Sequence, residues 1–185
     1  MPQTTTKKQK KSKKYTQKEY KKLILENIKL LAIKIIFIVI LIYVVFFWVF
    51  GVTRLKDRAM KPNVADGDLL LYYRLDKNYE IEDIVTFKKD DKRYVLRIIA
   101  TAGQTITLNS DGDFIIDGGT EKHQTYFKNE IPENSQITYP YTVEPNHVFV
   151  VGDYRLDTND SRTFGAIDVS IIDGKVISLL QTKNL

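Results

Sequence analysis

The chain has 185 residues and no cysteine, so disulfides, thiol nucleophiles and thiolate metal sites are excluded. Its formal net charge of +5 is unevenly divided, because residues 1–52 hold a net charge of +9 and the remainder a net charge of −4. The basic charge therefore belongs to a tail, which argues against a nucleic-acid-binding domain. With only His123 and His147 as imidazoles, we expect neither a metal site nor a cofactor.

The N-terminal third predicts a tail followed by a membrane anchor. Residues 1–22 are rich in lysine and lack apolar periodicity, so we predict a disordered tail. Residues 23–52 turn apolar, and no charge interrupts Ile35–Val52. At about 1.5 Å per residue this run, extended past Lys34, approaches the ~30 Å hydrocarbon core of a bilayer. No small-residue cleavage site follows it closely, which favours a retained signal anchor over a cleaved signal peptide.

The lysine distribution predicts an orientation for this anchor. Because basic residues stay on the cytoplasmic side, residues 1–22 should lie in the cytoplasm and residues 53–185 outside the cell. We therefore expect a single-pass protein of the cell membrane, with the lipid bilayer as its first partner and no nucleic-acid partner.

Residues 53–185 predict a mainly β, antiparallel domain. Short runs rich in β-branched and aromatic residues alternate with Gly and Asp turn signals, and residues 120–147 form a longer polar insertion. The predicted strands are Leu69–Arg74, Asp83–Lys88, Tyr94–Ala100, Thr105–Leu108, Phe114–Ile116, His147–Val151 and Lys175–Leu180. The predicted turns are residues 89–92, 111–112, 117–119 and 173–174.

Two stretches of this domain combine residues that order loops or carry chemistry. The first is Ala59-Met60-Lys61-Pro62, which Asp66-Gly67-Asp68 follows soon afterwards. The second is residues 152–165, GDYRLDTNDSRTFG, directly after an apolar strand. Arginine matches carboxylate geometry well, so Asp–Arg pairs could order this second stretch as a platform. A charged surface turn is the simpler alternative.

Together with the anchor, these stretches resemble bacterial type I signal peptidase, especially the small single-anchor forms of Gram-positive bacteria. The family's first motif, Ser-Met-x-Pro-Thr-Leu-x-x-Gly-Asp, is matched at Met60, Pro62, Gly67 and Asp68. Three further motifs follow in order. Gly-Asp-x-Val-x-Phe resembles residues 82–87, Lys-Arg followed by two hydrophobic residues resembles residues 96–104, and Gly-Asp-Asn-Arg-x-x-Ser-x-Asp-Ser-Arg resembles residues 152–162. The resemblance covers roughly residues 20–180 and implies an antiparallel β-sheet ectodomain of the signal-peptidase type.

The departures from the family concern its chemistry. In the family, a serine hydroxyl attacks the scissile carbonyl and a buried, neutral lysine takes its proton. Ala59 stands at the serine position and Leu96 at the lysine position, so neither a nucleophile nor a base is intact. Asp57 occupies a position where some members place an oxyanion-binding hydroxyl, and its carboxylate would repel an oxyanion.

The rest of the motif set is retained. The resemblance therefore implies a family frame without its catalytic pair. The expected cleft and motif residues are Asp57, Ala59, Met60, Pro62, Leu96, Arg97, Gly152, Asp153, Arg155, Asp160, Ser161 and Arg162.

Three functions fit this pattern to different degrees. The first is a non-catalytic signal peptidase homologue that binds or assembles secreted or pilus precursors, as the resemblance to pilus-associated homologues of Gram-positive cocci implies. The second is an active signal peptidase that uses unorthodox groups, such as Ser161 or Lys61. The third is a membrane-tethered adhesive β module that is unrelated to peptidases.

Overall fold

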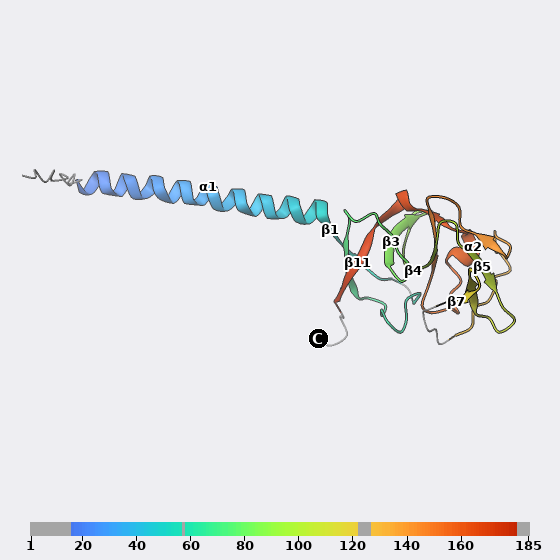
Figure 1. Cartoon of the computed structure of the whole chain (residues 1–185). Helices are drawn as coiled ribbons and strands as arrows, with labels where there is room; N and C mark the ends of the chain where they lie inside the picture. The colour runs from blue at the N-terminus through green and yellow to red at the C-terminus, as the bar shows by residue number, and fades with distance from the viewer. Residues whose placement is uncertain (1–15, 57, 122–126, 181–185) are drawn as a thin grey trace, which may run out of the picture. The chain divides into compact units, whose positions relative to one another are not determined.

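The computed structural model describes residues 16–56, 58–121 and 127–180. The chain divides near Val45 into an N-terminal helical unit and a β unit, and each is described by itself. Figure 1 shows the two units in the colours of the chain. The expected disorder of residues 1–15 and the histidine at His123 lie outside the described residues.

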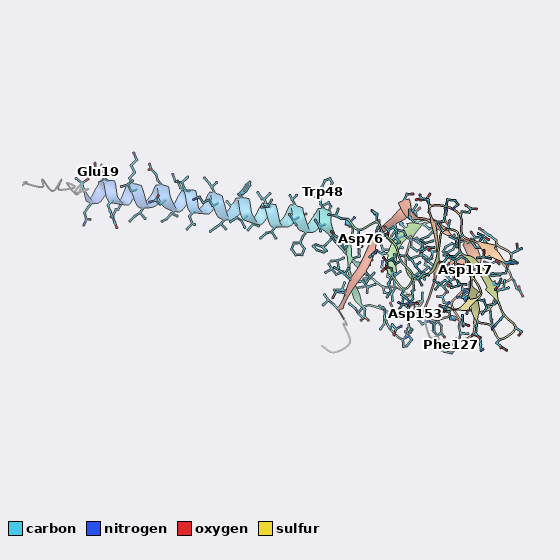
Figure 2. The ribbon with its side chains drawn as sticks, viewed as in Figure 1. Glu19, Trp48, Asp76, Asp117, Phe127 and Asp153 are labelled. Atoms are coloured by element: carbon cyan, nitrogen blue, oxygen red, sulfur yellow. The ribbon has the colours of Figure 1, made fainter. Side chains whose placement is uncertain are left out.

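The helix α1 spans Gln17–Val49. It begins six residues before the predicted apolar segment, so residues 17–22 are helical and do not belong to a disordered tail. A local capping interaction explains this correction. The Thr16 hydroxyl and backbone N–H both donate to the Glu19 carboxylate, at 2.8 and 2.9 Å. The Glu19 N–H donates in return to the Thr16 hydroxyl oxygen at 3.5 Å, and such reciprocal bonding satisfies donors that the first turn of a helix leaves open. Figure 2 shows Glu19 and Trp48 towards the two ends of α1.

By length and composition, α1 could cross a membrane. None of its residues is buried within the protein, and apolar side chains cover it on all sides. The apolar run itself is longer than its helical part. Phe50–Arg54 forms strand β1, which pairs antiparallel with β2 (Leu69–Tyr73), so the helix ends three residues before the predicted end of the anchor.

The β unit contains two sheets in which every pairing is antiparallel, which confirms the predicted fold class. The larger sheet has the order β1, β2, β11 (Ile172–Leu180), β3 (Ile84–Lys89), β4 (Lys92–Thr101), β9 (His147–Val151) and β10 (Ile167–Asp168). The smaller has the order β7 (Gly119–Thr120), β6 (Phe114–Ile116), β5 (Thr105–Leu108) and β8 (Tyr141–Thr142). A short helix α2 (Ser161–Phe164) and a 3-10 turn η1 (Val169–Ile171) precede the last strand.

Left-handed turn residues fix two of the predicted hairpins. Asp90 and Asp91 have φ values of 49° and 59° between β3 and β4, where Lys89 pairs with Lys92. Asp117 and Gly118 have φ values of 51° and 83° between β6 and β7. Two residues with positive φ make the turn whose twist matches that of the flanking strands.

The predicted turn at residues 173–174 is wrong. Both residues lie inside β11, where the register with β3 shifts between Ile172 and Gly174. Such a shift is a β-bulge, and it is compatible with the same residue types as a hairpin turn. Gly174 is required there because an added Cβ would lie 2.2 Å from the Tyr73 carbonyl oxygen.

Three apolar clusters form the core. The first joins β3, β4 and β9 and includes Val85, Phe87 and Ile98. The second joins the smaller sheet to β9 and includes Phe114 and Phe149. The third consists of Leu55, Met60, Val64, Leu70 and Val95, and it includes residues of β2 and β4 and packs against β11. Since the strands of the larger sheet are shared between clusters, the sheet has apolar contacts on both faces.

Replacing Gly174 with alanine should destabilise the β unit, because the new methyl group would overlap the Tyr73 carbonyl. We expect a loss of about 1–3 kcal/mol, the usual cost of overpacking. Urea unfolding of the full chain in detergent, followed by near-UV circular dichroism of its tyrosines, measures it. Gly119→Ala is the control, because the nearest atom to its added Cβ is 3.6 Å away. Equal stability of both variants would contradict the bulge.

Candidate functional site

The two positions that lack catalytic groups meet in one apolar cluster. Ala59 lies on the turn after β1, and Leu96 lies in the middle of β4 opposite Val85. Both side chains are buried in the first core cluster with Phe87, and Leu96 is only 1% exposed. The fold therefore brings together the methyl group and the isobutyl group predicted from the motifs, and surrounds them with apolar side chains.

The turn that carries Ala59 is held by backbone contacts to the loop of residues 152–165. The Tyr154 N–H donates to the Ala59 carbonyl at 2.9 Å. A Cβ added to Gly152 would lie 2.5 Å from that same carbonyl oxygen. Only glycine allows this approach, so Gly152 is needed for close packing of two chain segments.

The neighbours of Ala59 divide between two environments. Met60 is fully buried, but it lies in the third cluster with Leu55 and Val95. Pro62 is exposed at the tip of the turn, and Asp57 lies outside the described residues. The turn thus connects two core clusters.

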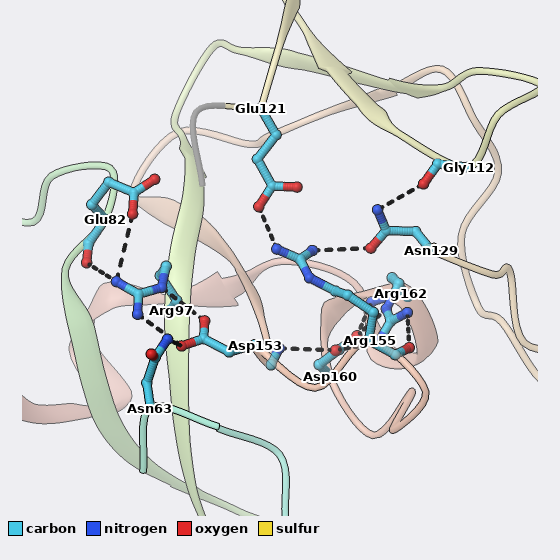
Figure 3. Close-up of polar contacts among 11 residues, drawn as sticks. Asn63, Glu82, Arg97, Gly112, Glu121, Asn129, Asp153, Arg155, Asp160 and Arg162 are labelled. Atoms are coloured by element: carbon cyan, nitrogen blue, oxygen red, sulfur yellow. Dashed lines mark hydrogen bonds and ion pairs between the residues drawn. The ribbon is translucent and has the colours of Figure 1, made fainter. Parts of the chain in front are cut away.

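A buried ion pair connects β4 to the loop of residues 152–165, as Figure 3 shows. The Arg97 Nε and Nη2 atoms donate to the two carboxylate oxygens of Asp153, each at 2.8 Å. The Asn63 side-chain amide donates to Asp153 as well, at 2.8 Å, and Arg97 Nη1 donates to the Glu82 carbonyl at 3.0 Å. Burial acts to lower the pKa of Arg97, but the bonds to Asp153 outweigh it and raise the pKa above its ordinary value.

A second carboxylate organises the remainder of the motif. Asp160 caps α2, and its Oδ1 accepts from the backbone N–H and the Nε of Arg162, both at 3.0 Å. Its Oδ2 accepts from the Gly152 N–H at 3.1 Å and from Arg162 Nη2 at 2.8 Å. Arg162 Nη1 also donates to the Arg155 carbonyl at 2.7 Å. The loop is therefore closed on itself by its own side chains, as the Asp–Arg pattern predicts, and is not a solvated turn.

Arg155 and Ser161 bind the loop to its surroundings. The Arg155 guanidinium is fully buried, pairs with Glu121 and donates to the Asn129 side-chain oxygen at 3.0 Å. Ser161 is also fully buried, and its Oγ accepts from the Val150 N–H of β9 at 3.0 Å. Both residues join the loop to strands or to the insertion.

Four partners of this network are not among the expected cleft and motif residues. They stand in turns or in the polar insertion, far along the chain from the groups they bind. These partners are Asn63 and Glu82, which are 90 and 15 residues from the groups they bind, and Glu121 and Asn129, which are 34 and 26 residues from Arg155.

A groove of about 820 Å³ opens beside Val95 of β4, and we call it the β1–β4 groove. Residues 52–56 line one side, and residues 90–93 with Val95 line the other. Within the described residues, β1 pairs with β2 alone, and β4 pairs with β9 only from Arg97 to Thr101. The groove therefore lies between two strand edges that each have one strand neighbour along this stretch.

The fold and site define an antiparallel β protein with an N-terminal apolar helix and a groove beside two strand edges. Its sequence matches the family model described as signal peptidase, peptidase S26, over residues 27–180. This match spans most of the chain, and the chain belongs to the signal peptidase S26 family.

Curated relatives include proteins named as signal peptidases and proteins named as inactive signal peptidases. Signal peptidase I of Bacillus caldolyticus is 30% identical over 148 residues, which cover 70% of this chain and 78% of that protein. Inactive signal peptidase IA of Staphylococcus aureus (strain Mu50) is 26% identical over 156 residues, 80% of this chain and 88% of that protein. Among solved structures, a signal peptidase I from Enterococcus faecalis V583 matches 55% of this chain and 97% of its own, with 24% identity and a TM-score of 0.44.

The buried Arg97–Asp153 pair should be strongly coupled. Asp153→Leu alone leaves the guanidinium without its carboxylate and should cost about 3–5 kcal/mol of unfolding free energy. Adding Arg97→Met should recover part of this loss, with a coupling of about 0.5–3 kcal/mol in urea unfolding of the full chain. The pair Arg93–Asp173 is the control, since its side chains are 40% and 29% exposed and should couple by less than about 1 kcal/mol. Additive effects at Arg97 and Asp153 would contradict this arrangement.

Leu96→Lys should make the stability of the β unit depend on pH. An ammonium group at this apolar, buried position is disfavoured, so burial should lower the lysine pKa in the folded state. The unfolded chain then binds more protons between that lowered pKa and its own value of about 10.4, so stability rises as pH rises through this window. Urea unfolding between neutral and alkaline pH measures the effect relative to Leu96→Met, whose thioether does not titrate. Parallel pH profiles of the two variants would mean that position 96 is solvated.

Proposed function

We propose that this protein is a membrane-anchored, non-catalytic signal peptidase homologue that holds extended segments of secreted or pilus protein precursors. The observation that carries the proposal is the burial of Ala59 and Leu96 in one apolar cluster, at the two positions where the family resemblance requires a hydroxyl and an amine. Family membership supports secreted precursors as the class of client, and the pilus assignment rests on the resemblance to pilus-associated homologues.

The chemistry of the two residues supports a non-catalytic role. Acyl transfer needs a nucleophile beside a general base, and neither methyl nor isobutyl groups provide one. The nearby Ser161 is fully buried and accepts a hydrogen bond from the Val150 N–H, which fits a structural use of its hydroxyl. Lys61 lies on the turn after Met60 and adjoins no hydroxyl side chain in sequence.

The β1–β4 groove supports peptide binding without cleavage. A peptide that is added as a strand gains main-chain hydrogen bonds at a sheet edge and is selected by pockets for alternate side chains. Val95 lines the groove directly before Leu96, and Leu55 lines it from the other side. An extended segment in the groove would therefore pass Val95, which directly precedes Leu96, and Leu55, which lies four residues before Ala59.

The anchor supports action at a membrane surface. Helix α1 has the length and composition to span a bilayer, and the lysine-rich segment before it favours a cytoplasmic N-terminus. The β unit would then stand outside the cell, single-pass in the cell membrane, where secreted precursors emerge.

We expect the native full-length protein in detergent micelles to bind, but not cleave, a preprotein with a small-x-small site. The double variant Ala59→Ser, Leu96→Lys restores the hydroxyl and amine of the family dyad. Cleavage by this variant would support the view that the groove still accommodates signal peptides. Mass spectrometry of the products and fluorescence anisotropy of a labelled signal peptide measure cleavage and binding separately.

The single variants serve as matched controls, because each restores only one member of the dyad and should remain inactive. Cleavage by the native protein would overturn the non-catalytic role. If the native protein cleaves, Ser161→Ala and Lys61→Gln then test whether these groups carry the activity. Absence of binding by the native protein would overturn the client-holding role.

A further inference from the structure

On one side of the β1–β4 groove, which we call its outward side, both flanking segments carry exposed cations, namely Arg54, Lys56 and Lys92. Along the β1 flank, Thr53 and Leu55 are buried, while Arg54 and Lys56 between and after them are exposed. Side chains of an extended chain alternate between two faces, so Arg54 and Lys56 share the face opposite Leu55. Both line the groove, and within the described residues neither makes an ion pair.

Strand β4 contributes a third cation on the same face. Tyr94 and Leu96 belong to the first core cluster, whereas Val95 belongs to the third, which also contains Leu55. Lys92 alternates in phase with Tyr94, and its Nζ lies 4.8 Å from the centre of that ring. Lys92 therefore lies on the face opposite Val95, as Arg54 and Lys56 lie on the face opposite Leu55.

The other charged groups that line the groove have partners of their own. Asp91 pairs with Lys88 at 2.9 Å, and Asp90 lies 3.7 Å from Lys89, both beside the hairpin turn. Arg93 pairs with Asp173 at 2.5 Å. After these pairs are set aside, the cations Arg54, Lys56 and Lys92 leave the outward side of the groove with an excess of positive charge.

We propose that the groove selects extended peptide segments that carry Asp or Glu at alternate positions. A strand added between β1 and β4 would direct every second side chain towards Leu55 and Val95, and the others to the face of Arg54, Lys56 and Lys92. Opposite charges on neighbouring strands attract, and like charges repel. This inference names the client chemistry of the proposed groove and therefore rests on the peptide-holding function.

The test uses the full chain in phosphatidylcholine nanodiscs and three labelled short peptides of identical length. Alanine and valine alternate with Glu in the first peptide, with Gln in the second and with Lys in the third. We expect the Glu peptide to bind about 5-fold more tightly than the Gln peptide, and the Lys peptide to bind least, by fluorescence anisotropy at low salt. At about 1 M NaCl, where the Debye length is about 3 Å, the preference should disappear.

Single charge-removing variants locate the preference. Arg54→Gln, Lys56→Gln and Lys92→Gln should each reduce the ratio of Glu-peptide to Gln-peptide affinity. Lys128→Gln is the matched control, because it removes one exposed cation beside Asp113 and away from the residues that line the groove. An equal loss with Lys128→Gln would assign the preference to net charge and overturn the proposal.

The outcomes distinguish failure of the acidic preference from failure of the peptide-holding function. If no peptide binds, the peptide-holding function fails. If the Glu and Gln peptides bind equally, that function stands and the acidic preference is overturned. If the preference is absent, and a short-chain phosphatidylglycerol instead binds in a manner that Arg54→Gln and Lys56→Gln weaken, the cations serve a lipid headgroup and the proposal is overturned.

Discussion

One buried carboxylate, Asp153, holds together the three segments that surround Ala59 and Leu96. It binds Arg97 of β4 through two oxygens and also accepts from Asn63, which lies on the turn after Ala59. The position of Asp153 depends on the preceding Gly152, because the lack of a side chain there allows the Ala59 carbonyl to approach. A buried carboxylate is tolerated only when its charge is matched and its lone pairs are used. The arrangement of turn, strand and loop is therefore specified by electrostatics as much as by apolar packing.

This constraint does not depend on the side chains at positions 59 and 96. The residues that hold the loop in place are Asp153, Asp160, Arg155 and Arg162, and none of their contacts passes through the side chain of Ala59 or Leu96. A reactive lysine at position 96 would need to be neutral in an apolar cluster, which is a strained arrangement. Leucine removes that conflict and adds apolar contacts with Val85 and Phe87. Leucine at position 96 is thus physically favourable for the fold.

Local patterns predicted much of this fold, and the failures have local causes too. The turn at Asp90-Asp91 was predictable because short polar residues tolerate positive φ between two β-rich runs. Gly174 was assigned to a turn because a bulge and a hairpin use the same residue types. Strand β1 cannot be predicted from the pattern because its first residues, 50–52, continue the apolar composition of the helix, and only its pairing with β2 distinguishes it. Within the site, the Asp–Arg motif predicted an ordered loop, but its partners Asn63 and Glu121 carry no pattern, since they bind across 90 and 34 residues of chain.

Two strand edges of the larger sheet, those of β1 and β4, flank the groove in which we propose that peptides bind. An unpaired strand edge attracts further strands, and proteins normally cover or charge such edges. Here the edges of β1 and of the first half of β4 flank a groove whose floor contains Leu55 and Val95, and whose outer side carries cations. Positive charge discourages pairing with another copy of the same edge, while it leaves the groove open to a strand of opposite charge. The cations that would discourage self-pairing of these edges are therefore the ones that the proposed selection of an acidic strand would use, and such selection requires no nucleophile.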